Sequence, residues 1–415
     1  LMSYSSLTPE QSMLALWYIT NTSLISYYKL VNHCGDAASA LSQNQSIWKL
    51  LGIHAAHIKR WQDVNDVLAF LDKVRHDVEL KMYGIVYVSD EDYPETLKSI
   101  YDPPPVLFYR GNLIRLKDRQ IAIVGSRSPT EIAQKITFDL AQYLVQSGYT
   151  VTSGLAQGVD KQAHLGALSQ LSVLSGRTVG VMGTGINVCY PRNHNALFAQ
   201  IIKDGGCLIS ELLPATPASK HTFPRRNRLV AGLSLATVVT EAALQSGSLI
   251  TARLSAEQGK QVFAIPSHIH NPNAEGCLHL IREGATLIYH PDQILEDLSQ
   301  HDQEFFNALP KSFSQGMSIF SEESSKLNTH PSQAPDTNTL VSPNPKTAAH
   351  HLQPASRSTC VPEHLADLYA LMNEPCDLDQ LVFSSQKDTG SLLAELMELE
   401  ILGLIEQVGG RYGRL

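Results

Sequence analysis

The chain has 415 residues, of which 43% are hydrophobic and 17% are charged. This composition allows a sizeable apolar core and excludes a fibrous or wholly disordered chain, and the length favours two to four domains of about 100 to 200 residues. No basic N-terminal region precedes an apolar run, and no stretch of about 18 apolar residues would cross a bilayer. The six cysteines are scattered without a CxxC pair, which argues against a disulfide framework or a zinc site. We therefore expect a soluble, cytoplasmic protein without a membrane partner or a bound metal.

Charge is distributed unevenly along the chain. The formal net charge of −8 is unfavourable for a nucleic-acid-binding protein, because Lys and Arg make most phosphate contacts. Residues 361–415, however, hold ten acidic and three basic residues and account for −7 of this total. Residues 161–240 hold eight basic and two acidic residues, a local excess of +6. This basic region is a candidate surface for a polyanion.

The first segment, residues 1–80, is predicted to form a small helical domain. Apolar residues recur at helical spacing from Met13 to Trp17 and again from Val64 to Leu71. Thr8, Pro9 and Glu10 provide an N-cap, a first-turn proline and a first-turn acid for the opening helix.

Residues 81–300 are predicted to form an α/β core. Short β-rich runs bounded by Gly or Pro alternate there with longer helical stretches, which favours a mostly parallel sheet with helices on both faces, an extended Rossmann-like arrangement. The candidate strands are Ile121–Val124, Val151–Thr152, Thr178–Met182, Cys207–Ile209, Ala236–Thr240 and Gln261–Ile265, and the clearest helices are Ile132–Ser147 and Asn195–Lys203.

The C-terminal third of the chain is predicted to hold a linker and a winged-helix domain. Residues 301–360 are interpreted as a disordered linker, because 321–360 are rich in polar residues and proline and lack an apolar period. In 361–415, leucines at helical spacing outline three helices, and Gly409 and Gly410 suit a two-residue hairpin turn. The third helix, Ser391–Leu402, carries three glutamates (Glu395, Glu398 and Glu400) and no basic residue, so we expect it to bind protein rather than duplex DNA.

Three glycine-bearing loops follow predicted strands. The carboxyl ends of parallel strands face a common crevice, and glycine lets the backbone approach a phosphate closely. Each loop alone can be a simple tight turn, but three together, one of them with an arginine, favour a phosphate-binding surface. The loops are Gly125-Ser126-Arg127, Ser153-Gly154-Leu155-Ala156-Gln157-Gly158 and Gly183-Thr184-Gly185.

Further candidates for anion binding lie downstream of these loops. The densest basic cluster contains Lys220, Phe223, Arg225, Arg226, Asn227 and Arg228. It can be a solvated surface loop, but no acid lies between Glu211 and Glu241 to neutralise it, so we favour phosphate binding with a stacking ring. A second surface is predicted at Arg192, Asn195 and Phe198, where Phe198 is either a stacking ring or the buried face of a helix. Ser246, Gly247 and Ser248 are expected to serve backbone capping or phosphate binding.

Several enzymatic signatures are incomplete or missing. The dinucleotide fingerprint has Val188 in place of its third glycine, and the sequence lacks the GxxxxGK[ST] loop, GxSxG and HExxH. His164 is predicted to be a histidine satisfied within the core or near the crevice rather than a catalytic base. We expect no cofactor and no catalytic residues.

At these residues the sequence resembles the DprA/Smf family, also called DNA-processing protein A. The resemblance covers roughly residues 82–290, with the motifs in the family's order. It also extends to the flanks, where the helical segment resembles a SAM-like domain and 361–415 a winged helix. Ser267, where the family usually has glycine, and a short insertion at 169–175 depart from the pattern. The matching residues are Gly125-Ser126-Arg127, Ser153-Gly154-Leu155-Ala156, Gly158, Asp160, Ala163-His164, Gly183, Gly185, Tyr190-Pro191, Ser210-Glu211, Phe223-Pro224-Arg225-Arg226-Asn227-Arg228, Glu241-Ala242-Ala243, Ser246 to Ala252 and Phe263-Ala264-Ile265-Pro266.

The resemblance implies a DNA-binding protein that is not an enzyme. Family membership would mean binding of single-stranded DNA in a basic pocket, homodimerisation, protection of incoming DNA and loading of RecA recombinase during natural transformation. An alternative is a nucleotide-binding or nucleotide-hydrolysing Rossmann enzyme related to lysine-decarboxylase-like phosphoribohydrolases, with Glu241 as the catalytic acid, although the PGGxGTxxE motif is absent. A small-ligand sensor with a winged-helix output is a weaker alternative.

Overall fold

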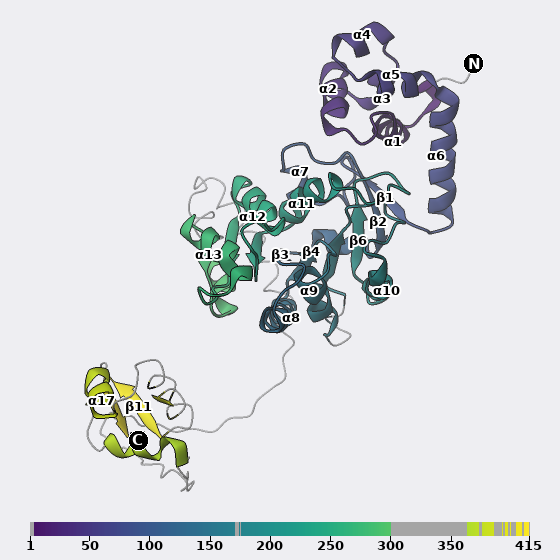
Figure 1. Ribbon diagram of the computed structural model, residues 1–415. Helices are drawn as coiled ribbons and strands as arrows, with labels where there is room; N and C mark the ends of the chain where they lie inside the picture. The colour runs from purple at the N-terminus through teal and green to yellow at the C-terminus, as the bar shows by residue number, and fades with distance from the viewer. Residues whose placement is uncertain are drawn as a thin grey trace, which may run out of the picture. The chain divides into compact units, whose positions relative to one another are not determined.

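The structure is a computed structural model, and it describes residues 4–170, 174, 176–299, 363–372, 376–385, 392, 395–396, 399, 404–408 and 411–414. The chain divides into two compact units, Leu1–Leu327 and Asn328–Leu415, which are described separately below (Figure 1). The predicted linker at 301–360 lies outside the described residues. Among the helices that are described, none has the length and apolar character needed to span a membrane.

The N-terminal part of the first unit is a helical module, as predicted. Its opening helix begins after a complete capping box, in which Thr8 Oγ1 accepts from the backbone N–H of Gln11 at 3.2 Å and the Gln11 side chain accepts from Thr8 N at 3.0 Å. The fully buried rings of Trp17 and Trp48 fill the core of the module. Its helices are η1 (Tyr4–Ser6), α1 (Pro9–Ile19), α2 (Leu24–Cys34), α3 (Ala37–Leu41), α4 (Gln45–Leu50), α5 (Ala55–Gln62) and α6 (Val64–Glu79).

The core that follows is built on a nine-stranded sheet of order β1-β2-β6-β5-β4-β3-β7-β8-β9. All six predicted strands are present, and they pair in parallel with one another. The strands are β1 (Gly84–Tyr87), β2 (Val106–Gly111), β3 (Gln120–Val124), β4 (Thr150–Ser153), β5 (Thr178–Val181), β6 (Cys207–Ser210), β7 (Ala236–Val239), β8 (Gln261–Ala264) and β9 (Thr286–Leu287).

The sequence did not reveal β1 and β2, which form an antiparallel extension of the sheet. β1 pairs with β2, and β2 pairs with β6, in both cases antiparallel. They are separated by α7 (Glu95–Lys98) and by the prolines at 103–105, so no regular alternation of strand and helix marks them.

Helices cover both faces of the sheet (Figure 1). Successive side chains of a strand point to opposite faces: Ile121 and Ile123 of β3 pack with α8 (Glu131–Gln146) and α9 (Val159–Leu168), whereas Ala122 and Val124 pack with α11 (Thr222–Leu233) and α12 (Ser248–Glu257). The other helices of this core are η2 (Leu113–Lys117), η3 (Arg192–His194), α10 (Asn195–Lys203), η4 (Pro272–Ala274) and α13 (Glu275–Arg282), and residues 292–299 are also helical.

The order of the strands places a crevice at the carboxyl ends of the central parallel strands. From β3 the chain runs outward through β4, β5 and β6, and it then returns to add β7 and β8 on the other side of β3. The helices after β3 and β7 therefore lie on opposite faces, and the loops at the carboxyl ends of these strands are separated. Ligands of open α/β sheets bind at such switch points.

The second unit is a small helical domain with a three-stranded sheet of order β10-β12-β11. Leu368, Leu381, Leu396 and Tyr412 contribute to its core. Gly409 and Gly410, and also Glu398 and Glu400 of the expected third helix, lie outside the described residues. The described elements are η5 (Glu363–Leu365), α16 (Ala366–Leu371), β10 (Cys376–Asp377), α17 (Leu378–Ser385), β11 (Ile405–Val408) and β12 (Arg411–Arg414).

Candidate functional site

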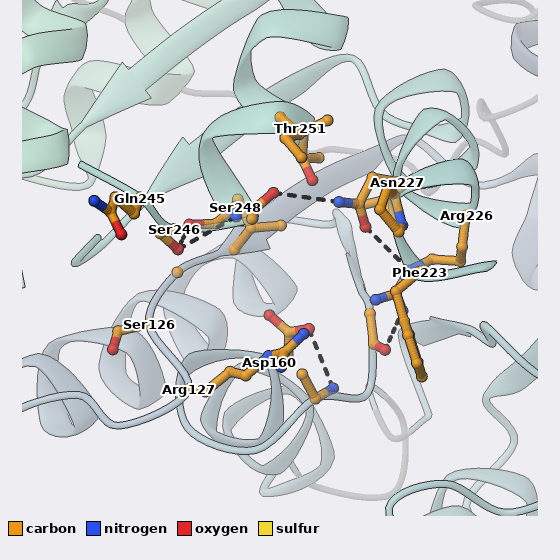
Figure 2. A pocket seen from close by; sticks show the side chains of 18 of the residues that line it. Ser126, Arg127, Asp160, Phe223, Arg226, Asn227, Gln245, Ser246, Ser248 and Thr251 are labelled. Carbon is orange, nitrogen blue, oxygen red and sulfur yellow. Dashed lines mark hydrogen bonds between the residues drawn. The ribbon is translucent and has the colours of Figure 1, made fainter. Parts of the chain in front are cut away.

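A cavity of about 920 Å³ opens at the switch point of the sheet (Figure 2). Residues from the loops after β3, β4 and β7 line it, together with the first turns of α11 and α12. A smaller cavity of about 220 Å³ adjoins it and extends towards the loop after β5. Six residues line both cavities, so they form one continuous hollow: Arg127, Gly154, Ala156, Tyr190, Phe223 and Arg226.

Arg226 forms the floor of this hollow. Its side chain is 7% exposed, and its Nη1 donates to the carbonyl oxygen of Val181 at 2.6 Å and to that of Gly154. A Cβ on Gly154 would overlap the guanidinium group, so any larger residue at this position would displace it. Burial lowers the pKa of Arg226. The residue therefore ties α11 to the ends of β4 and β5 and contributes positive charge from beneath the cavity.

Asp160, in the first turn of α9, lies beside this arginine. Its Oδ2 accepts from the backbone N–H of Ala156 at 3.2 Å. Burial raises the pKa of Asp160, and this outweighs the attraction of Arg226 and Arg127. Because Arg226 is buried beneath the cavity, the exposed cations of the rim are more accessible to an anion.

Two cations of the rim are available to a ligand. Arg127, in the loop after β3, and Lys220, before α11, are both exposed and line the cavity. Within the part of the chain that the structure describes, neither side chain has a hydrogen-bond or ion-pair partner. The loop before α12 adds hydroxyl groups, with Ser246 Oγ 2.6 Å from Ser248 Oγ. Cations and hydroxyl groups of this kind suit phosphate oxygens.

Two aromatic rings stand beside the cations. The centroids of Tyr190 and Phe223 are 5.3 Å apart, and the Tyr190 side chain is 49% exposed. A Cβ on Gly183 would lie 2.6 Å from a ring carbon of Phe223, which explains the glycine of the third predicted loop. Phe223 is partly buried, so Tyr190 is the more accessible of the two rings, and aromatic rings next to cations are typical of surfaces on which nucleic-acid bases stack.

The structure brings together part of the predicted phosphate surface. Of the predicted residues, eleven line the large cavity (Gly125, Ser126, Arg127, Gly154, Lys220, Phe223, Arg226, Asn227, Ser246, Gly247 and Ser248), and Gly183 lines the small one. Ser153 and Gly185 do not. Ser153 Oγ is buried and donates to Ile123 O at 2.6 Å, and Gly185 packs against the backbone of Leu213. These two residues therefore contribute to the conformation of the loops and do not line the cavities.

The second predicted surface is not part of the hollow. Phe198 is 4% exposed and packs in the core below α10, so its interpretation as a stacking ring was wrong, and the alternative of a buried helix face is confirmed. Arg192 and Asn195 are exposed but line neither cavity. The contribution of this segment comes instead from Tyr190, which the family motif contained but which the sequence did not mark as a stacking residue.

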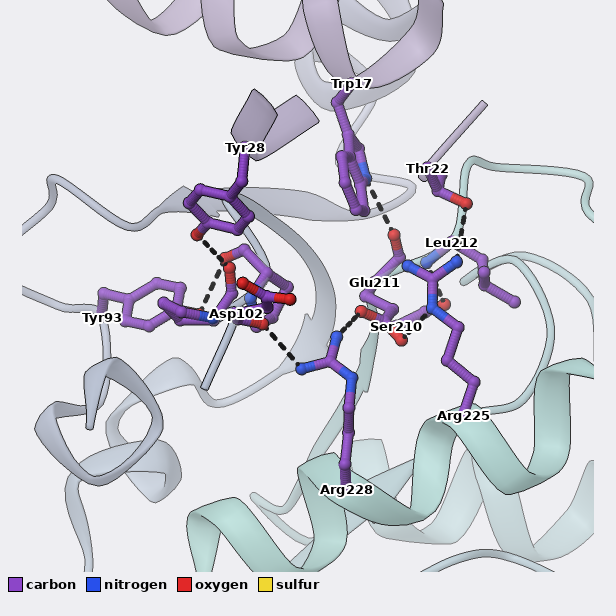
Figure 3. Close-up of polar contacts among 12 residues, drawn as sticks. Trp17, Thr22, Tyr28, Tyr93, Asp102, Ser210, Glu211, Leu212, Arg225 and Arg228 are labelled. Carbon is purple, nitrogen blue, oxygen red and sulfur yellow. Dashed lines mark hydrogen bonds and ion pairs between the residues drawn. The ribbon is translucent and has the colours of Figure 1, made fainter. Parts of the chain in front are cut away.

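Arg225 and Arg228 reach instead towards Glu211 (Figure 3). Arg225 Nε lies 2.9 Å from Glu211 Oε1, an ion pair in which the N–H is not aligned for a hydrogen bond. Arg228 Nη2 pairs with Glu211 Oε2. The expectation that no acid neutralises the basic cluster was therefore wrong, because Glu211, at the end of β6, lies across from α11. Neither arginine lines the hollow.

The candidate catalytic groups have structural partners. Glu241 accepts from Thr130 N at 2.9 Å, from Thr130 Oγ1 at 2.8 Å and from Asn271 Nδ2 at 3.2 Å, and it does not line the cavity. His164 is fully buried with Nδ1 2.7 Å from Thr178 Oγ1, and burial lowers its pKa to about 3, which confirms a core histidine. Among the described residues, no cluster of His, Cys, Asp or Glu has the composition of a metal site.

Known proteins share this architecture. Residues 84–299 match the family model described as DNA recombination-mediator protein A. Protein Smf of Escherichia coli strain K12 is 35% identical over 338 residues, which cover 81% of this chain and 79% of that protein. The chain belongs to the DNA recombination-mediator protein A family.

Further members of this family agree with the assignment. DNA processing protein DprA of Bacillus subtilis strain 168 is 39% identical over 219 residues, which cover 52% of this chain and 72% of that protein. The X-ray structure of DNA processing protein A from Streptococcus pneumoniae has a TM-score of 0.60 and 32% identity, and it covers 71% of this chain and 98% of that chain. Residues 353–411 match the DprA winged helix domain, which confirms the fold predicted for the C-terminal unit.

Proposed function

We propose that this protein binds single-stranded DNA in the hollow at the switch point. It would protect incoming DNA there and load RecA recombinase onto it during natural transformation. The observation that carries this proposal is the convergence of Arg127, Lys220 and Arg226 with the rings of Tyr190 and Phe223 around one cavity. Backbone phosphates would contact the cations while unpaired bases stack on the rings.

The rings favour a single strand over a duplex. In a duplex each base is already stacked and paired, so exposed rings in a recess gain little from it. A single strand can turn its bases away from the backbone and contact both kinds of group at once. The cations alone would bind either form, because phosphate contacts carry no information about strandedness.

The proposal includes no chemical step. Glu241, the catalytic acid of the alternative enzyme, is held by three hydrogen bonds away from the cavity. Asp160 is buried at the floor of the cavity. A homodimer, contact with RecA and a cytoplasmic location are parts of the proposal that the family resemblance implies.

A salt titration with two kinds of oligonucleotide tests the proposal. The full-length chain should bind a single strand more tightly than a duplex of the same length at every salt concentration. Arg127→Ala should weaken single-strand binding and reduce the slope of log K against log[salt] by about 0.7, the value for one phosphate contact on a single strand. Arg253→Ala, which removes an exposed arginine of α12 outside the cavity, is the matched control. Equal binding of both DNA forms, or equal effects of the two variants, would contradict the proposal.

A further inference from the structure

The helical module contacts the sheet core at a junction with the end of β6 and with α11 (Figure 3). Trp17 of α1 donates its indole N–H to the backbone oxygen of Glu211 at 2.9 Å. Thr22 Oγ1, in the turn after α1, accepts from Arg225 Nη1 at 3.2 Å. The Arg225 guanidinium carbon also lies 5.7 Å from the centroid of the Trp17 ring. The module thus contacts both the end of β6 and the helix that carries the basic cluster.

Glu211 takes part in contacts with both Trp17 and Arg225: its backbone oxygen accepts from Trp17, and its carboxylate pairs with Arg225. Its side chain is 3% exposed and lies between the guanidinium groups of Arg225 and Arg228. Arg228 Nη1 donates to the backbone oxygen of Asp102 at 2.9 Å. Each arginine therefore has a second partner outside the ion pair, so rotation of α11 about its axis would break several buried contacts at once.

Helix α11 presents different faces to the junction and to the cavity. Arg226 and Asn227 lie three and four residues after Phe223, and all three line the cavity. Arg225 and Arg228, also three apart, face the junction. Residues three or four apart share one face of a helix. Because the helix is one rigid element, the contacts on one face set the position of the side chains on the other.

We propose that the helical module positions the DNA-binding face of α11 through this junction. Trp17 and Glu211 act as positioning residues: they do not touch the ligand, but they fix the rotation of α11 at which Phe223 and Arg226 face the cavity. This inference rests on the proposed DNA binding, since the measured consequence is affinity for a single strand. It assigns the module, which lies outside the family match at 84–299, a role in the same site.

Two tryptophans of the module provide a matched pair of variants. Trp17 and Trp48 are both fully buried, and each donates its indole N–H to a backbone oxygen. The acceptor of Trp17 lies in the core at Glu211, whereas that of Trp48 lies within the module at Ala40, 3.1 Å away. Replacement by phenylalanine removes the donor and leaves an aromatic ring in both cases. The two variants lose similar contacts, and only one of them loses a contact to the core.

The experiment measures single-strand affinity of the full-length chain. Trp17→Phe should weaken binding by about 3- to 30-fold, the range expected when coupling between sites is lost, whereas Trp48→Phe should stay within about twofold of the wild type. Thr22→Val, which removes only the acceptor of Arg225, should weaken binding by about threefold. It becomes the deciding variant if Trp17→Phe does not fold.

A double-mutant cycle separates positioning from general loss of stability. If Trp17 acts through the cavity face of α11, its replacement should have a smaller effect in a Phe223→Ala background than in the wild type. Equal effects in the two backgrounds, or equal affinities of Trp17→Phe and Trp48→Phe, would overturn the inference while leaving DNA binding intact. A wild-type chain that does not bind a single strand would instead overturn the proposed function.

Discussion

The buried ion-pair cluster at Glu211 yields a prediction about stability. Glu211→Gln keeps the shape of the side chain but removes its charge, so that Arg225 and Arg228 lose their carboxylate. Their side chains are 26% and 15% exposed, against 3% for Glu211. Removing one partner of a buried ion pair costs about 3 to 5 kcal/mol. Because both arginines keep some contact with water, we expect the lower end of this range, about 3 kcal/mol.

Thermal unfolding of the full-length chain measures this loss. At about 2 to 4 °C per kcal/mol for a large domain, the melting temperature should fall by about 6 to 12 °C. Asp72→Asn is the control, because Asp72 and Arg75 form an ion pair in which both side chains are more than half exposed. It should shift the melting temperature by no more than about 2 °C.

A second substitution identifies the cause of the loss. Adding Arg228→Met to Glu211→Gln removes one of the two charges left without a carboxylate, and the double variant should be more stable than Glu211→Gln alone. If Glu211→Gln melts within about 2 °C of the wild type, or if Arg228→Met destabilises it further, the carboxylate does not neutralise the pair as argued.

Three further predictions concern the cavity and its surroundings. Gly154→Val should abolish tight single-strand binding, because the new side chain would displace the Arg226 guanidinium group, and a binding titration checks this. Tyr190→Leu should weaken binding by about 1 kcal/mol, or fivefold, through loss of base stacking, without a change in melting temperature. The pKa of His164 is lowered to about 3, so between about pH 6.5 and pH 3 the unfolded chain binds a proton that the folded chain does not. The free energy of unfolding should therefore decrease as the pH is lowered through this window, and it should decrease less steeply in His164→Asn.

Most strands of the core were predictable because they are short, are bounded by turn residues and are buried on both faces. β3, for example, has all five residues buried, and glycine follows it directly. In a parallel sheet such runs carry a clear signal. β1 and β2 carry none, since three of the four residues of β1 are only partly buried and the loop before β2 is rich in proline. They join the sheet through antiparallel pairing with distant segments, which local sequence does not reveal.

The basic cluster shows a limit of counting charges along a sequence. Glu211 lies 14 residues before Arg225 in the chain, yet the end of β6 and the start of α11 bring their side chains within 2.9 Å. Helical periodicity predicts part of this arrangement, because Phe223 and Arg226 are three residues apart and share one face of the helix, whereas Arg225 lies on another face. The direction of each face depends on β6 lying two strands away from β4 in the sheet, which only the fold supplies.

The number of cations that line the hollow also limits how steeply the DNA affinity should depend on salt concentration. The described residues that line the hollow include two rim cations, Arg127 and Lys220, and one buried cation, Arg226. Arg225 and Arg228 are committed to Glu211 and release no counterions on binding. With two to three phosphates neutralised at about 0.7 each, log K should fall against log[salt] with a slope between about −1.4 and −2.1 for a single hollow. A slope of about −4 or steeper on an oligonucleotide that fills one hollow would mean that cations outside it bind phosphates, and the cavity would then be only part of the interface.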